Sequence, residues 1–226
     1  LPDDVRHVVS SRDVSVAFLQ SDEFEQGEPP RYVSYKAWKK AALEVYRLRG
    51  PLYGQRSASR RWYETIAKWL IGQGFVQSAN EPCLFKHGNG SIVALYVDDL
   101  LLRGTRANSD AFHTALSERF DCRGGPSYLA PDAPLEFLGF TITMEEHEGE
   151  TYVYMDQHDA LSTFLAELDT ARIKAQDCPM PSLTKLFSDP TPLDDVSARV
   201  YRHSAGFLNF LAKTVLLNVF LNGHFF

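Results

Sequence analysis

The chain has 226 residues, of which 44% are hydrophobic and 23% are charged, and its formal net charge is −6. These values lie in the normal globular range, and the length suffices for one large domain or two small ones. The sequence contains no basic apolar leader and no uninterrupted apolar run long enough to cross a bilayer, so we expect no membrane partner. Three widely spaced cysteines without a CxxC pair argue against a disulfide scaffold and a zinc site, and they fit a reducing intracellular compartment: Cys83, Cys122 and Cys178.

The negative net charge argues against a nucleic-acid partner, because phosphate binding normally requires basic charge. The distribution of charge weakens this argument. Between Arg31 and Phe75 the sequence has ten Lys or Arg residues and only two Glu, so one basic stretch interrupts an acidic chain. A solvated helix face is an equally good explanation of such a run.

The N-terminal half begins with an apolar segment, Asp13–Leu19, which predicts a strand buried on both faces with Asp13 at its start. Apolar spacing predicts a helix over Ser57–Gly72, capped by Ser57 or Ser59. Short apolar runs on either side of Asp98-Asp99 predict a hairpin, Ile92–Tyr96 with Leu100–Leu102, that carries the two acids near its tip.

Similar patterns continue through the C-terminal half. A helix is predicted over Ser109–Phe120 with Ser109 as its cap, and a second hairpin over Glu136–Met144 and Thr151–Met155. Asp156 is expected to cap a third helix, a proline-containing connector covers Ala175–Asp195, and Tyr201–Phe226 reads as a largely apolar core helix. Hairpins with helices between them indicate an α+β fold with an antiparallel sheet.

Three carboxylates, Asp13, Asp98 and Asp99, stand among apolar residues with high strand propensity. Burying such charges is costly unless a cation neutralises them, and Mg²⁺ favours a few carboxylates together with substrate phosphates. Two such ions can activate an attacking hydroxyl and stabilise the departing oxygen in phosphoryl transfer. An isolated Asp-Asp pair is more often a solvated turn, so the residues alone leave both interpretations open.

Seven ordered motifs resemble those of the reverse transcriptases of copia-type LTR retrotransposons. Tyr96-Val97-Asp98-Asp99 is similar to the YVDD box, and Asp13-Val14 with Ala17-Phe18-Leu19 is similar to the DVxxAFL motif. The remaining matches are the following: Glu28-Pro29-Pro30, Leu48–Tyr63, Gly74-Phe75 with Glu81–Phe85, Phe137-Leu138-Gly139, and Tyr201-Arg202 with Gly206. They span about Asp13 to Thr214.

The resemblance implies a right-hand polymerase fold, with partial fingers and the palm in residues 1–155 and a truncated thumb or connection segment in residues 156–226. It implies RNA-directed DNA synthesis, with two Mg²⁺ ions, replaceable by Mn²⁺, held by Asp13, Val14, Asp98 and Asp99. The implied partners are an RNA or DNA template with its primer, dNTPs, and other domains of a Gag-Pol-type polyprotein. The implied location is a cytoplasmic particle or the nucleus.

Further roles follow from the resemblance residue by residue. Phe18 would exclude the 2′-hydroxyl of a ribonucleotide, with core packing as the alternative. Gly54 would let the backbone approach the template or the incoming base, and Tyr53 and Tyr96 would sit beside the nucleotide. Arg56, Arg60 and Arg61 would meet template phosphates, with a solvated helix face as an equally good explanation of each. Phe137, Leu138 and Gly139 would hold the primer end, with strand packing as the alternative.

Some features depart from the family. The family's Ser-Pro is Ala58-Ser59 here, residues that grip the triphosphate are not matched upstream of Asp13, and the segment after Thr214 differs. Because the chain starts at Leu1 and stops at Phe226 in an apolar segment, we expect both ends to be cut. One alternative is a retroelement fragment that keeps the fold and nucleic-acid binding but not catalysis. A metal-dependent phosphoesterase is the other, and the primer-grip and LYG matches speak against it.

Overall fold

The computed structural model describes residues 7–35, 44–167 and 192–221. It divides the chain into two compact units, Leu1–Leu138 and Gly139–Phe226. The boundary predicted between Met155 and Asp156 falls inside a strand, β11 (Glu150–Asp156). The strand pairs named below within each unit are antiparallel, and the mixed fold of helices and antiparallel sheets agrees with the predicted α+β class.

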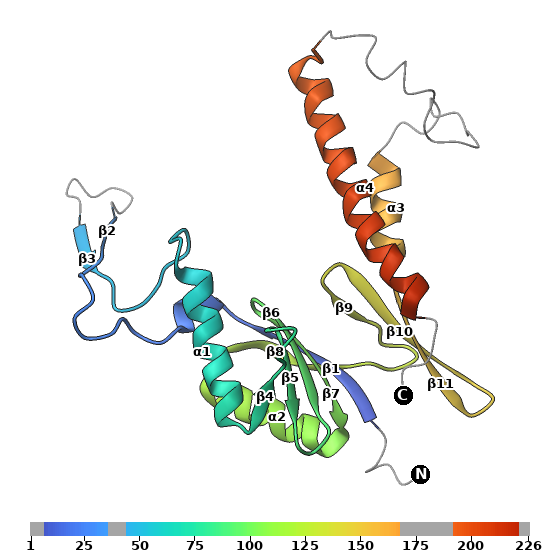
Figure 1. Ribbon diagram of the computed structural model, residues 1–226, viewed down its shortest axis with the longest axis horizontal. Coiled ribbons are helices and arrows are strands. Elements are labelled where there is room, and N and C mark those ends of the chain that lie inside the picture. The colour runs from blue at the N-terminus through green and yellow to red at the C-terminus, as the bar shows by residue number, and fades with distance from the viewer. Residues whose placement is uncertain (1–6, 36–43, 168–191, 222–226) are drawn as a thin grey trace. The chain divides into compact units, whose positions relative to one another are not determined.

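The first unit is built on a six-stranded sheet with the order β4-β5-β6-β7-β1-β8. Figure 1 shows this sheet with the helices α1 (Ala58–Gly72) and α2 (Arg106–Arg119) beside it. The strands are β1 (His7–Val14), β4 (Phe75–Gln77), β5 (Leu84–His87), β6 (Ile92–Tyr96), β7 (Asp99–Thr105) and β8 (Cys122–Tyr128). A separate hairpin pairs β2 (Tyr32–Tyr35) with β3 (Glu44–Arg47).

One face of the six-stranded sheet packs against both helices. Val93, Leu95, Leu100 and Leu102 are buried there together with helix residues such as Trp62. Trp69 of α1 contacts Phe112 and Phe120, with ring centroids 5.7 and 5.6 Å apart, so α1 and α2 share this core. The alternate residues of the central strands, including Ser11, Asp13 and Asp99, lie on the opposite face, which is only partly covered.

Several predicted elements are confirmed. The helix predicted over Ser57–Gly72 is α1, although the Ser57 side chain makes no capping hydrogen bond, and the hairpin around Asp98-Asp99 is formed by β6 and β7. The predicted helix over Ser109–Phe120 is α2. Its cap is Thr105, whose hydroxyl accepts a hydrogen bond from the Asn108 amide, whereas Ser109 is buried.

The strand predicted over Asp13–Leu19 is wrong. β1 instead ends at Val14, Val16 adopts a left-handed conformation with φ 43°, and Ala17–Gln20 form a 3₁₀ turn, η1. The sequence does not reveal where β1 begins because two of its buried side chains are polar. These are Ser10 and Arg12, which face the helices. An inward polar pair conceals the alternation that normally reveals a strand.

The second unit contains the hairpin of β10 (Phe140–His147) and β11, followed by α3 (His158–Glu167) and α4 (Asp195–Leu221). The Asp156 carboxylate accepts a hydrogen bond from the His158 amide at the start of α3. The helix predicted from Tyr201 begins six residues earlier, at Asp195. Most of the predicted connector, and Cys178, lie outside the described residues. Within the described part of the chain, no helix combines the length and hydropathy needed to span a membrane.

Candidate active site on the open face of the sheet

Asp13 and Asp99 lie directly opposite each other on neighbouring strands. The register of β1 and β7 pairs His7 with Thr105 and ends with Asp13 paired to Asp99. Directly opposed residues in an antiparallel pair are about 4.5–5.5 Å apart at Cα and project from the same face. Both carboxylates therefore project from the open face of the sheet.

Asp98 occupies the turn that joins β6 to β7, next to Asp99. Its backbone carbonyl accepts a hydrogen bond of 2.9 Å from the Val14 amide, which ties the turn to the end of β1. Val97, the residue before it, has φ 52°. Tyr96 pairs with Asp99 in the register and is half exposed. The predicted grouping of Asp13, Val14, Asp98, Asp99 and Tyr96 is thus present at one end of the sheet.

Asp99 lies in an environment that disfavours its charged form. Partial burial raises the pKa of Asp99 above its ordinary value, and the neighbouring charges of Asp98 and Asp13 raise it further. Arg123 of β8 is the register partner of Asp13 on the other side of β1, and its guanidinium lies 3.7 Å from the Asp13 carboxylate. The charges of Asp98 and Asp13 nevertheless raise the pKa of Asp99, so the Arg123 guanidinium does not cancel their effect on it.

The oxygen-rich, negative character of this group suits a hard divalent cation. In the described residues, however, no three His, Cys, Asp or Glu side chains converge closely enough to hold a metal ion. The donor types fit Mg²⁺, and the backbone register brings them together, but the side chains do not enclose one point.

Two of the predicted nucleotide-binding residues contact each other. Phe18 lies in η1 and packs against the edge of the core, and its ring centroid is 4.8 Å from that of Tyr53. Gly54, the next residue after Tyr53, has φ +89° and nothing within 4 Å of the place where a Cβ would stand. Glycine is therefore favoured at this position because of the positive φ, and not because a neighbouring atom would clash with a side chain.

The three arginines predicted to meet the template have different surroundings. Arg56 is exposed, and Arg60 pairs with Glu64 on the surface of α1 at 2.8 Å. Arg61 instead contacts Glu28 at 2.5 Å and lies over the Phe24 ring at 4.9 Å. The structure therefore gives Arg61 intramolecular contacts, and its contact with the template stays a prediction.

Of the predicted primer-holding residues, Phe137 ends the short strand β9 (Leu135–Phe137), and Leu138 and Gly139 form the tight turn that follows it. Leu138 and Gly139 both have positive φ, 56° and 77°, and Phe137 is buried while Leu138 is partly exposed. Along the chain, the division into two units falls between Leu138 and Gly139, within this turn.

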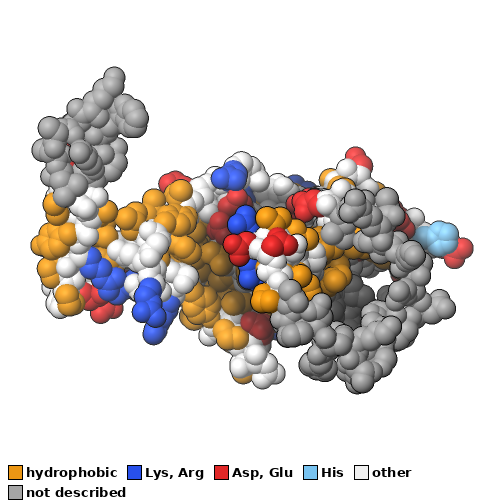
Figure 2. Space-filling model, turned by 90° about the horizontal axis from the view of Figure 1, so that it is seen from above, with side chains coloured by type: hydrophobic (Ala, Val, Ile, Leu, Met, Phe, Trp, Pro, Cys, Tyr) orange, Lys and Arg blue, Asp and Glu red, His pale blue; other side chains and the backbone are white. Residues whose placement is uncertain are grey.

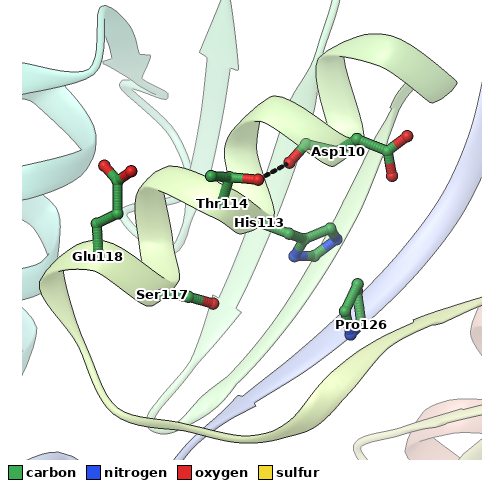
Figure 3. Close-up of a pocket in the computed structure, with 6 residues that line it drawn as sticks. All are labelled: Asp110, His113, Thr114, Ser117, Glu118 and Pro126. Carbon is green, nitrogen blue, oxygen red and sulfur yellow. Dashed lines mark hydrogen bonds between the residues drawn. The ribbon is translucent and has the colours of Figure 1, made fainter.

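Sequence reasoning missed a cavity of about 430 Å³ between α2 and β8. Figure 3 shows His113 and Ser117 on the side of α2 that faces Pro126 of β8. His113 is buried and shares a 2.9 Å hydrogen bond with Ser10, and the buried Arg12 donates to Ser117 at 3.1 Å. None of the predicted site residues lines this cavity. Arg12 faces the helices and Asp13 the open face, so the cavity is separate from the carboxylate group.

Comparison with known proteins connects these residues to a family. The profile described as reverse transcriptase (RNA-dependent DNA polymerase) matches residues 3–182. The chain is 29% and 32% identical to the retrovirus-related Pol polyproteins from transposons RE1 and RE2 of Arabidopsis thaliana, in alignments that cover 89% of the chain. It is 26% identical, over 81% of its length, to the corresponding polyprotein from transposon TNT 1-94 of Nicotiana tabacum. The chain spans 13–14% of the length of these relatives.

Proposed function

Since this chain belongs to the reverse transcriptase family, as its copia-type relatives confirm, we propose that it carries the palm of an RNA-directed DNA polymerase and acts as a nucleotidyltransferase. The observation that best supports this is the pairing of Asp13 with Asp99 across β1 and β7, with Asp98 on the adjoining turn. The reaction is attack of a primer 3′-hydroxyl on the α-phosphate of a dNTP, with pyrophosphate as the leaving group.

Asp13, Asp98 and Asp99, with the backbone of Val14, are the residues that would hold two Mg²⁺ or Mn²⁺ ions. Such ions supply a lowered pKa for the attacking hydroxyl and charge stabilisation for the departing oxygen. The protein's contribution is to fix the carboxylates on a rigid sheet, and their side chains must converge from the positions seen here. Burial and the nearby charges of Asp98 and Asp13 raise the pKa of Asp99, and a divalent cation bound among the three acids would offset the repulsion between these charges.

The open face also provides surfaces for the other reactants. The contact between Phe18 and Tyr53 supports a role for this pair beneath the sugar and base of the incoming nucleotide, with Gly54 beside them. A ring at Phe18 would leave no room for a 2′-hydroxyl. The turn of Phe137, Leu138 and Gly139 would support the primer end.

Exposed aromatic and basic side chains in the β2–β3 hairpin suit a single-stranded template. Tyr32, Val45 and Tyr46 are at least half exposed, and Arg47 is exposed beside them. In Figure 2 hydrophobic and basic side chains lie together at this end of the first unit. Aromatic platforms with nearby cations bind single strands largely without regard to sequence. We assign this hairpin to the fingers, the six-stranded sheet with α1 and α2 to the palm, and residues 156–226 to a thumb or connection segment.

Primer extension on an RNA template with dNTPs and Mg²⁺ or Mn²⁺ tests the proposal, with Asp98→Asn as the matched variant. Extension by the wild-type chain that disappears in the variant supports a polymerase that uses this acid. A folded wild-type chain that binds primer–template without extending it would contradict the proposed activity and indicate a fragment that keeps only the fold and binding. We expect the chain to be covalently linked to other domains of a polyprotein. We expect it to act in a cytoplasmic particle or in the nucleus.

A further inference from the structure

The turn that carries Asp98 is strained. Val97 has φ 52°, a left-handed conformation that β-branched residues rarely adopt. Such a conformation is energetically unfavourable and persists only where the surroundings impose it. The structure must therefore contain contacts that hold this peptide in place.

Trp62 of α1 provides one such contact. Its indole N–H donates a hydrogen bond to the carbonyl oxygen of Val97. The side chain is 1% exposed, and its ring meets Phe120 edge-on at a centroid distance of 5.2 Å. The indole N–H is a donor only, and when it is buried it needs an acceptor. Because the ring is fixed by the core, the direction of this hydrogen bond is fixed as well.

The next peptide of the turn is held from the other side. The carbonyl of Asp98 accepts a hydrogen bond of 2.9 Å from the amide of Val14, whose side chain is fully buried. The carbonyls of Val97 and Asp98 are thus fixed by α1 and by β1, respectively. The two hydrogen bonds leave little freedom for the Asp98 backbone between them.

We propose that Trp62 is a positioning residue for the catalytic turn. Its indole N–H holds Val97 in the left-handed conformation and so fixes the backbone from which the Asp98 carboxylate projects. Trp62 touches neither substrate nor metal, and its effect on the reaction passes through Val97. The effect of Trp62 on catalysis rests on the proposed polymerase function, whereas its effect on the conformation of the turn does not.

The alternative is that Trp62 only fills the core, and the substitution Trp62→Phe separates the two. Phenylalanine keeps an aromatic ring in the core but removes the donor. Trp69→Phe is the matched control, since Trp69 lies about two helical turns beyond Trp62 in the same helix and packs against Phe112 and Phe120. A second variant, Trp62→Phe with Val97→Gly, removes the donor and also the strain, because glycine adopts positive φ freely.

The first measurement uses NMR and needs no activity. The chain has three tryptophans, so Trp62→Phe identifies one of three indole N–H signals. We expect that signal to exchange slowly with solvent in the wild-type chain. We also expect the amide signals of Val97, Asp98 and Asp99 to shift in Trp62→Phe and to stay in place in Trp69→Phe. A rapidly exchanging Trp62 indole, or unshifted turn amides in Trp62→Phe, would overturn the proposal.

The second measurement is steady-state primer extension. Loss of one directed hydrogen bond should lower kcat about 10-fold with little change in KM for dNTP, since the turn acts on the reacting groups. In Trp62→Phe the Mg²⁺ concentration that gives half the maximal rate should rise. The rate of Trp69→Phe should stay within about twofold of the wild-type rate. Adding Val97→Gly to Trp62→Phe should restore most of the lost rate. An equal loss in both tryptophan variants, or no rescue, would contradict positioning. Shifted turn amides in a chain without any extension would refute the polymerase while leaving the role of Trp62 intact.

Discussion

The rings of Phe18 and Tyr53 lie 4.8 Å apart, centroid to centroid, with their planes tilted by 38°. Phe18 follows the strand that ends with Asp13-Val14, whereas Tyr53 precedes α1, so the contact joins the two segments expected to meet a nucleotide. The contact gives Phe18 a fixed position next to the open face. It also means that Phe18 contributes to packing, because part of the side chain rests against the core.

Phe18→Ala should relax discrimination against ribonucleotides. Removing the ring opens the space that a 2′-hydroxyl would need, so incorporation of rNTP relative to dNTP should rise at least about 10-fold, equivalent to about 1.4 kcal/mol of lost discrimination. Single-nucleotide extension with paired dNTP and rNTP measures this ratio. Phe18→Tyr keeps the ring and is the control, expected to retain wild-type selectivity. If Phe18→Ala lowers stability and leaves the ratio unchanged, the residue serves packing alone.

Asp98→Asn should abolish activity and stabilise the metal-free protein. Metal ligands contribute several kcal/mol to phosphoryl transfer, so the rate should fall at least about 100-fold. Burial, Asp98 and Asp13 together raise the pKa of Asp99, so removing the Asp98 charge relieves repulsion at neutral pH and should raise the thermal midpoint. Thermal unfolding in EDTA checks this effect, with the exposed Asp132→Asn as control. An unchanged or lower midpoint would show that the three acids do not repel one another significantly.

The spacing of apolar residues along the sequence predicts those parts of the site that lie on regularly patterned helices and strands. α1 and the β6–β7 hairpin follow directly from apolar spacing, and they place Asp98 and Asp99 correctly. β1 was misplaced because Ser10 and Arg12 face the core, and β8 was not predicted because its sequence, CRGGPSY, has no apolar alternation. Gly and Pro are tolerated there because β8 is an edge strand. The contacts of Trp62 with Val97 and of Arg123 with Asp13 join distant segments, so no local pattern reveals them.

Arg61→Ala and Arg56→Ala should have different effects. Arg61 is a quarter exposed and binds Glu28, whose pKa it lowers, so its loss should reduce the thermal midpoint. Arg56 is exposed, so its loss should weaken primer–template binding and reduce the slope of log affinity against log salt by about 0.7–1. Thermal unfolding and binding titrations at several salt concentrations separate the two. Equal salt slopes for wild type and Arg56→Ala would exclude a phosphate contact at that residue.

His113 should make the stability of the first unit depend on pH. Burial lowers the pKa of His113 to about 4 from 6.5, and the nearby Arg12 charge acts in the same direction. Between pH 6.5 and about 4 His113 is protonated in the unfolded chain but not in the folded chain. The free energy of unfolding therefore has its full value above pH 6.5, decreases as the pH falls, and levels off below about pH 4. The full contribution is about 3 kcal/mol, from 1.36 kcal/mol per pH unit.

Urea unfolding between pH 7 and 4 tests this dependence with the variant His113→Gln, which cannot take up the proton. The difference in free energy of unfolding between wild type and variant should change by about 3 kcal/mol across that interval, with the wild type losing more as the solution is acidified. The exposed His147→Gln is the matched control and should follow the wild-type curve. Parallel curves for wild type and His113→Gln would mean that His113 can be protonated inside the folded chain. In that case the cavity between α2 and β8 would have to admit solvent to the imidazole.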